Sequence, residues 1–120
     1  MSSSEQKFFA VLETAIPEAP IFPKMRVADV IEANERWSGD FLRISQKHFD
    51  WVLCHPESFE PLLAIELDDS SHRLRKNAAS DVTKDSVAAD AGLPLMRFQW
   101  QNEYDVAAIR ERLTSVINAL

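Results

Sequence analysis

At 120 residues the chain has the length of one domain with its own hydrophobic core, and its single cysteine, Cys54, excludes an internal disulfide and a cysteine-rich zinc site. A formal net charge of −6 at pH 7 argues against nucleic-acid binding that depends on a basic surface alone. No apolar run approaches the roughly 18 residues of a membrane helix, and the start, MSSSEQKFF, lacks a secretory pattern, so we expect a cytoplasmic protein without a membrane partner.

The first predicted elements are a helix and an edge strand. Ser2, followed by two further serines and Glu5, suits a helix start, because a serine side chain accepts hydrogen bonds from the free amides of the first turn. Apolar residues at helical spacing extend this helix to about Ile16. Residues 21–27 predict a strand with Lys24 and Arg26 pointing outward, and the proline at position 23 confines it to a sheet edge or a strand start.

Two further strands are predicted at residues 48–54 and 62–68. Both have β-type composition, and the intervening sequence His-Pro-Glu-Ser has turn chemistry. Because a parallel crossover needs a dozen or more residues, the short connection predicts an antiparallel hairpin. Less regular structure is expected before this hairpin, as helical turns or loops at residues 28–31 and 41–47 and a polar loop at 34–40.

The remaining chain predicts a polar loop, a helix, a strand and a final helix. The loop covers residues 71–76, and the alanine-rich helix at 77–91 ends at Gly92, which suits a C-terminal cap. Residues 93–100 predict a strand. Residues 103–120 predict an amphipathic helix with an apolar stripe, formed by Val106, Ile109, Leu113, Val116 and Ile117. The order α, β, β, β, α, β, α predicts one α/β domain over residues 1–120, with helices flanking a central, mixed four-stranded sheet.

The stretch PLLAIELDDSSH, residues 61–72, carries the main functional signal. Its apolar run is typical of a buried strand, yet it ends in Glu66, Asp68 and Asp69. Buried carboxylates without a partner are strongly disfavoured, and a bound cation is a common remedy. Glu66 and Asp68 point the same way by strand alternation, and a hairpin register that turns Asp50 toward them would gather three carboxylates. Such oxygen ligands suit Mg²⁺, so we expect a metal site here.

An aspartate on one strand, an apolar strand that ends in glutamate, and then a helix and a strand resemble the PD-(D/E)xK restriction-endonuclease-like superfamily. The segments HFDWVLCHP and PLLAIELDDSSH are more closely similar to an uncharacterised bacterial family of domains of unknown function, related to very-short-patch-repair-like nucleases. The resemblance covers residues 5–98. It implies a restriction-endonuclease-like core and a nuclease that uses Mg²⁺ or Mn²⁺ to hydrolyse phosphodiester bonds of nucleic acid, with DNA favoured. A homodimer and a larger DNA-processing system both stay open as its setting.

The resemblance also implies which residues bind the metal. Asp50 and Glu66 occupy the metal-ligand positions, and the backbone carbonyl of Leu67 would complete the ligand set. Glu5 could match an additional acidic residue that many members carry on the first helix.

The lysine of the superfamily motif is replaced in this chain by Asp68. We expect Asp68 to contribute to the catalytic site, and His72, Lys84 and, more weakly, Lys47 are candidates to replace the lysine. A helical projection does not decide whether Lys84 faces the site, because either side of its helix could be buried. The absent lysine and the negative charge favour an alternative, a catalytically decayed nuclease fold that binds nucleic acid or protein.

Overall fold

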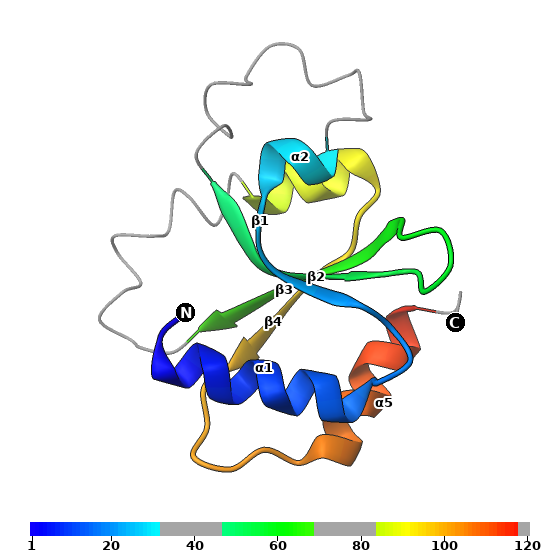
Figure 1. The fold of residues 1–120 in the computed structure, drawn as a ribbon. Coiled ribbons are helices and arrows are strands. Elements are labelled where there is room, and N and C mark those ends of the chain that lie inside the picture. The colour runs from blue at the N-terminus through cyan, green and yellow to red at the C-terminus, as the bar shows by residue number, and fades with distance from the viewer. Residues whose placement is uncertain (32–46, 69–83, 118–120) are drawn as a thin grey trace.

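The computed structural model describes residues 1–31, 47–68 and 84–117 (Figure 1). The elements in chain order are α1 (Ser3–Ala15), β1 (Ile21–Arg26), α2 (Val27–Ile31), β2 (His48–Cys54), β3 (Pro61–Asp68), an unlabelled helix at 84–91, β4 (Leu95–Gln99) and α5 (Val106–Val116). The expected order is confirmed, with α2 as a short helix near the expected helical turn. Four predictions lie wholly or largely outside the described residues, namely those for 34–40, 41–47, 71–76 and the start of the helix at 77–91.

The four strands form one open mixed sheet in the order β1-β2-β3-β4. β1 pairs antiparallel with β2, and β2 pairs antiparallel with β3, which confirms the predicted hairpin. β4 pairs parallel with β3, and the helix at 84–91 lies on the crossover that this parallel pairing requires. β1 is an edge strand, as the proline within it predicts.

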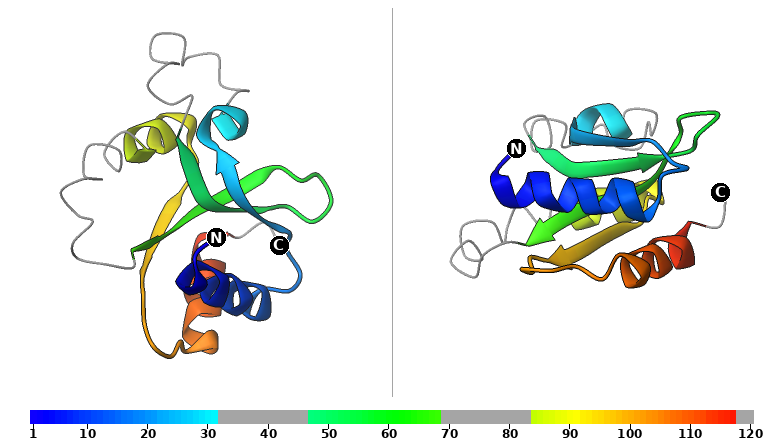
Figure 2. Two further views of the ribbon diagram at one scale, coloured as in Figure 1. Left: turned by 60° about the vertical axis from the view of Figure 1, so that its left-hand side comes forward. Right: turned by 60° about the horizontal axis from the view of Figure 1, so that its bottom comes forward.

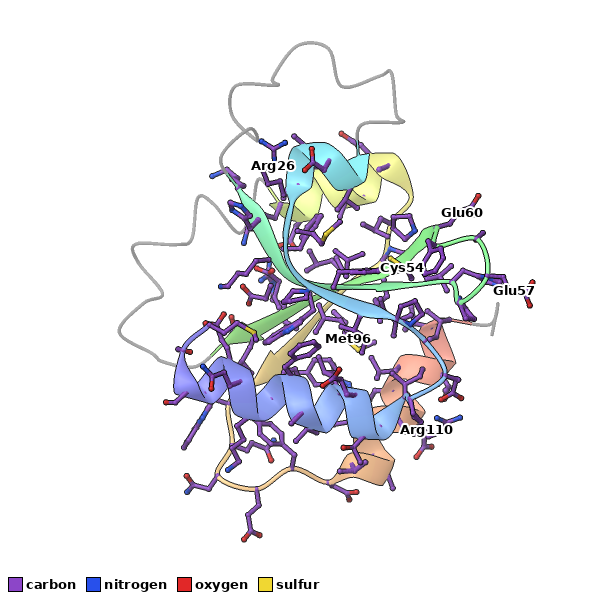
Figure 3. All side chains as sticks on the ribbon, in the orientation of Figure 1. Arg26, Cys54, Glu57, Glu60, Met96 and Arg110 are labelled. Atoms are coloured by element: carbon purple, nitrogen blue, oxygen red, sulfur yellow. The ribbon has the colours of Figure 1, made fainter. Side chains whose placement is uncertain are left out.

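Helices cover both faces of the sheet (Figures 1 and 2). α1 and α5 lie on one face, while α2 and the helix at 84–91 lie on the other. Each face has its own apolar cluster: Leu63 and Ile65 of β3 pack toward α1 and α5, whereas Ala64 packs toward the opposite helices. Of the residues labelled in Figure 3, Met96 packs against the cluster on the side of α1 and α5, and Cys54 belongs to the cluster on the opposite side. β3 is therefore buried on both faces, which explains its continuous apolar run.

Local signals fix the ends of several helices. At the start of α1, the Glu5 amide donates to Ser2 Oγ at 3.2 Å and the Ser2 amide donates to Glu5 Oε1 at 3.0 Å, so the expected serine cap is a full capping box. Gly92 has a φ of +72°, and the Leu93 amide donates to the Ala88 carbonyl at 2.9 Å. This left-handed cap confirms the predicted end of the helix at 84–91.

The final helix is shorter than expected. α5 begins after Asp105, whose side chain accepts from the Ala108 amide at 3.1 Å, and its regular structure ends at Val116. Ile109 and Leu113 are buried as the stripe predicts, but Val116 is 37% exposed. Within residues 1–31, 47–68 and 84–117, no helix has the length and apolar character needed to cross a bilayer.

Candidate active site

The site forms where β2 and β3 separate. Their backbone pairing runs to Trp51 and Ile65, and continuing that register places Asp50 opposite Glu66. At this point hydrogen bonds to side chains replace the backbone hydrogen bonds between the strands. The Asp50 amide donates to Glu66 Oε2 at 2.7 Å. The Leu67 amide donates in turn to Asp50 Oδ2 at 2.9 Å. The two carboxylates therefore satisfy the backbone amides that the diverging strands leave without a partner.

Glu66 is 4% exposed and is the buried charged residue of the described chain. β3 directs its side chain to the sheet face that carries Ala64, which is also the face covered by the helix at 84–91. Burial of a carboxylate at this depth requires a partner of opposite charge or strong hydrogen bonds.

Lys84 supplies the opposite charge. Its Nζ lies 2.8 Å from Glu66 Oε1, and its side chain is only 13% exposed. Val87 and Ala88 of the same helix pack into the adjoining apolar cluster, so the helix buries the side that includes Lys84. The structure thus answers the question that the helical projection left open. The lysine beside Glu66 therefore comes from the helix at 84–91.

Arg97 extends the cation side of the cluster from β4. Its Nη1 lies 3.8 Å from Glu66 Oε1, and its Nη2 donates to Asp85 Oδ1 at 2.9 Å. Glu66 therefore faces two cations, of which Lys84 makes the direct hydrogen bond.

Sequence reasoning missed Lys24. This residue, expected only as an outward position on β1, places its Nζ 2.8 Å from Glu5 Oε2 and 4.0 Å from Asp50 Oδ1. Glu5, on α1, joins the cluster through this lysine. The one available sequence signal was a lysine beside a proline in an edge strand, which by itself is typical of a solvent-exposed position.

Burial dominates the electrostatics of the carboxylate pair. It raises the pKa of Asp50, although the Leu67 amide and the charges of Lys84 and Lys24 oppose the change. Burial and the neighbouring Asp50 charge raise the pKa of Glu66, against the opposing effect of Lys84. Two adjacent carboxyl groups with raised pKa values retain a proton more readily than ordinary acids, so a further positive charge beside them is favourable.

Glu5 differs from this pair. Burial alone would raise its pKa, but the hydrogen bonds from Lys24 and Ser2 outweigh burial and lower the pKa to about 2. For Lys24, burial favours the neutral amine, yet its contact with Glu5 and the charge of Asp50 raise its pKa. The Glu5 and Lys24 pair is therefore fully ionised near neutral pH.

The low pKa of Glu5 predicts an acid-sensitive contribution to stability. A carboxyl group with a lowered pKa in the folded state contributes fully above its unfolded pKa of 4.5, and loses that contribution as pH falls toward about 2. Glu5→Gln keeps a capping-box side chain but removes the charge. We expect the difference in unfolding free energy between wild type and this variant to shrink by about 1–2 kcal/mol over that range, allowing for screening around the half-exposed Lys24. Urea titrations at several pH values measure it.

Glu13→Gln is the matched control, because Glu13 is an exposed carboxylate on the same helix. A Glu5→Gln variant whose stability follows the wild-type pH dependence throughout would contradict the assigned ion pair.

Asp68, which we expected in the catalytic site, does not join this cluster. Asp68 Oδ2 accepts from the Gln99 side chain at 3.4 Å, and its carbonyl accepts from the Trp100 amide at 2.8 Å. Among the described residues no group of three or more His, Cys, Asp or Glu side chains could hold a metal, so Asp50, Glu66 and Asp68 do not form the three-carboxylate cluster that we expected. Asp68 lies two residues further along β3, about 7 Å beyond Glu66, past the point where β2 and β3 separate.

The other expected site residues are Leu67, Lys47 and His72. Leu67 is 4% exposed and packs toward α1 and α5, while its amide holds Asp50. The Lys47 carbonyl accepts from the Val27 amide at 2.9 Å, next to the start of β2. His72 lies outside the described residues.

Comparisons with known proteins give one result. A search of the curated proteins and a search of the solved structures each find no match to this chain. A family model described as "Protein of unknown function (DUF2726)" matches residues 1–117, a range that contains Asp50, Glu66 and Lys84 as well as the ion pair of Glu5 and Lys24. The expected relation to a family of domains of unknown function is confirmed, and the chain belongs to the DUF2726 family.

Proposed function

We propose that this chain is a metal-dependent nuclease of the PD-(D/E)xK restriction-endonuclease-like superfamily that hydrolyses phosphodiester bonds, with DNA as the favoured substrate. One observation carries the proposal: Lys84 Nζ lies 2.8 Å from the buried Glu66 carboxylate, which adjoins Asp50. Two acidic residues on neighbouring strands and a lysine thus meet in one place. That is the residue set of the superfamily motif, with the lysine supplied by the next helix.

The arrangement of the elements supports the same proposal. A helix, an antiparallel hairpin and a crossover to a parallel strand follow one another, and helices cover both faces of the sheet. The acidic pair lies on the two central strands, β2 and β3, where the superfamily resemblance places it.

The donor set fits Mg²⁺ or Mn²⁺. Mg²⁺ is commonly held by one or two carboxylates together with waters and substrate phosphates, so a group of three protein carboxylates is not required. Asp50 uses Oδ2 for the Leu67 amide, and Oδ1 is turned toward Lys24 at 4.0 Å. Asp50 and Glu66, with the Leu67 carbonyl, would hold the ion, and their raised pKa values are consistent with a site that gains from added positive charge.

The residues of the chain then have separate roles. A bound ion would supply electrophilic stabilisation of the phosphate charge. Lys84 has three N–H donors and uses one of them for Glu66, so another can donate to a phosphate oxygen as negative charge develops there. Because its side chain is 13% exposed, this interaction is stronger than it would be in open solvent.

The experiment is a cleavage assay with supercoiled plasmid and single-stranded DNA in the presence of Mg²⁺ or Mn²⁺. We expect cleavage by the wild type, abolished by EDTA and by the double variant Asp50→Ala, Glu66→Ala. The control is Glu13→Ala, Glu111→Ala, which removes two exposed carboxylates on α1 and α5 and should cleave normally. Persistent cleavage by the Asp50, Glu66 double variant would overturn the proposal.

A second function, a binding module with a decayed site, is favoured by a different observation. Glu66 and Asp50 already accept hydrogen bonds from Lys84 and two backbone amides, so much of their charge is compensated within the described chain. Calorimetry that detects no divalent-cation binding, together with no cleavage, would favour this module. Metal-dependent thermal stabilisation that Glu66→Gln abolishes would count against it.

A further inference from the structure

The edge strand β1 places the ammonium group of Lys24 beside the site, and Lys24 has an unusual backbone conformation. Lys24 has a φ of +53°, a region that residues other than glycine rarely occupy. Between β1 and β2, Pro23 pairs with Trp51 and Met25 pairs with Phe49. Lys24 is left out of this pairing, and its position in the register is opposite Asp50. A strained conformation persists where the surroundings hold it, and such positions are concentrated at functional sites.

Two carboxylates compete for this lysine. Glu5 Oε2 accepts a hydrogen bond from Lys24 Nζ at 2.8 Å, whereas Asp50 Oδ1 lies 4.0 Å from the same atom, beyond hydrogen-bond length. The other oxygen of Asp50 is held by the Leu67 amide. Glu5 therefore holds the ammonium group close to Asp50 without allowing the two to bond directly.

The two lysines of the cluster differ in their exposure. The Lys84 side chain is 13% exposed and lies against the buried Glu66, so it acts as a fixed counter-ion. The Lys24 side chain is 47% exposed, so its ammonium group can move into solvent. Of the two lysines, Lys24 is therefore the one that can move away when a metal cation binds at Asp50.

We infer that Glu5 and Lys24 regulate divalent-cation binding at Asp50. Lys24 is a resident counter-ion that opposes entry of the cation, and Glu5 is a positioning residue that keeps Lys24 off Asp50 Oδ1. Without Glu5, the ammonium group is free to bond Asp50 and to block Oδ1, the oxygen that the Leu67 amide leaves available. This inference deepens the proposed metal-dependent function and rests on it.

The test is a calorimetric titration with Mn²⁺, without DNA, of the wild type, Glu5→Gln, Lys24→Met and the double variant. We expect Glu5→Gln to weaken Mn²⁺ binding about three- to tenfold and Lys24→Met to strengthen it by a similar factor, as for one partly screened charge pair. In the Lys24→Met background, Glu5→Gln should change the affinity by less than about twofold, because no ammonium is left to hold.

Controls separate this effect from general charge and from misfolding. Glu13→Gln and Lys7→Met remove exposed charges on α1 and should leave Mn²⁺ affinity unchanged. Thermal unfolding without metal verifies that each variant folds. If Lys24→Met does not fold, Lys24→Gly removes the same charge and suits the positive φ.

The outcomes distinguish the two proposals. A wild type that binds no Mn²⁺ overturns both this inference and the metal-dependent function. Binding by the wild type with unchanged affinity in Glu5→Gln and Lys24→Met overturns this inference alone. A Glu5→Gln effect of equal size in both backgrounds would show that Glu5 acts on the cation directly, which also overturns the role of Lys24.

Discussion

Lys84→Met is expected to lower the free energy of unfolding by about 3 kcal/mol, because it leaves the buried Glu66 carboxylate without its hydrogen-bonded cation. The expected cost lies at the low end of the usual range for a broken buried pair, since Arg97 remains 3.8 Å from Glu66. Chemical denaturation at pH 7 measures the change. If the proposed function holds, the same variant should lose DNA cleavage by about 10²-fold or more, through loss of a donor to the phosphate.

The double variant Glu66→Gln, Lys84→Met provides the internal control for this ion pair. It removes both charges, so it should be more stable than Lys84→Met alone, with a coupling of about 1–2 kcal/mol between the two sites. Glu13→Gln, which removes an exposed charge on α1, should leave stability nearly unchanged. A Lys84→Met protein as stable as the wild type would contradict the assigned pair.

Trp51→Ala is expected to destabilise the chain by about 3–5 kcal/mol, the cost of a large cavity in a packed core. Trp51 is 0% exposed, and its ring lies 5.4 Å from the Phe8 ring, where β2 meets α1. It is also the residue next to Asp50 on β2, so the loss of its packing removes support from the site. Urea unfolding followed by circular dichroism measures the change.

Trp51→Phe is the informative comparison. The Trp51 indole N–H is buried and has no hydrogen-bond partner among the described residues. Phenylalanine leaves a smaller cavity and removes this unpaired donor, so it should cost much less than alanine, within about 1–2 kcal/mol of the wild type. A phenylalanine variant as unstable as the alanine variant would contradict this expectation.

The local elements of the fold could be predicted from the sequence because their signals are local. The serines and Glu5 define the start of α1, Gly92 defines the end of the helix at 84–91, and the bounds predicted for β2, residues 48–54, match the observed strand. The short turn between β2 and β3 required an antiparallel hairpin, whose register then placed Asp50 opposite Glu66. The two strands and their carboxylates were therefore within reach of sequence reasoning, whereas the register was not, because it shifts between Leu53 and Cys54.

The cations around that pair depended on the tertiary structure. The helix at 84–91 has apolar residues on two sides, and only its packing against Ala64 and Val52 selects the side that carries Lys84. Lys24 contacts Glu5 across 19 residues of sequence, and its positive φ is a conformation that a lysine at this position does not indicate. Asp68 shares a strand face with Glu66 by alternation, yet it lies past the separation of β2 and β3 and contacts Gln99 instead.

The sequence by itself determined two carboxylates on neighbouring strands, because the strand pattern and the length of the turn depend on the order of residues. Only the tertiary structure decided which lysines compensate them, because long side chains reach their partners across layers. The energy of a buried charge depends on every group around it, and those groups come from α1, β1, β4 and the helix at 84–91.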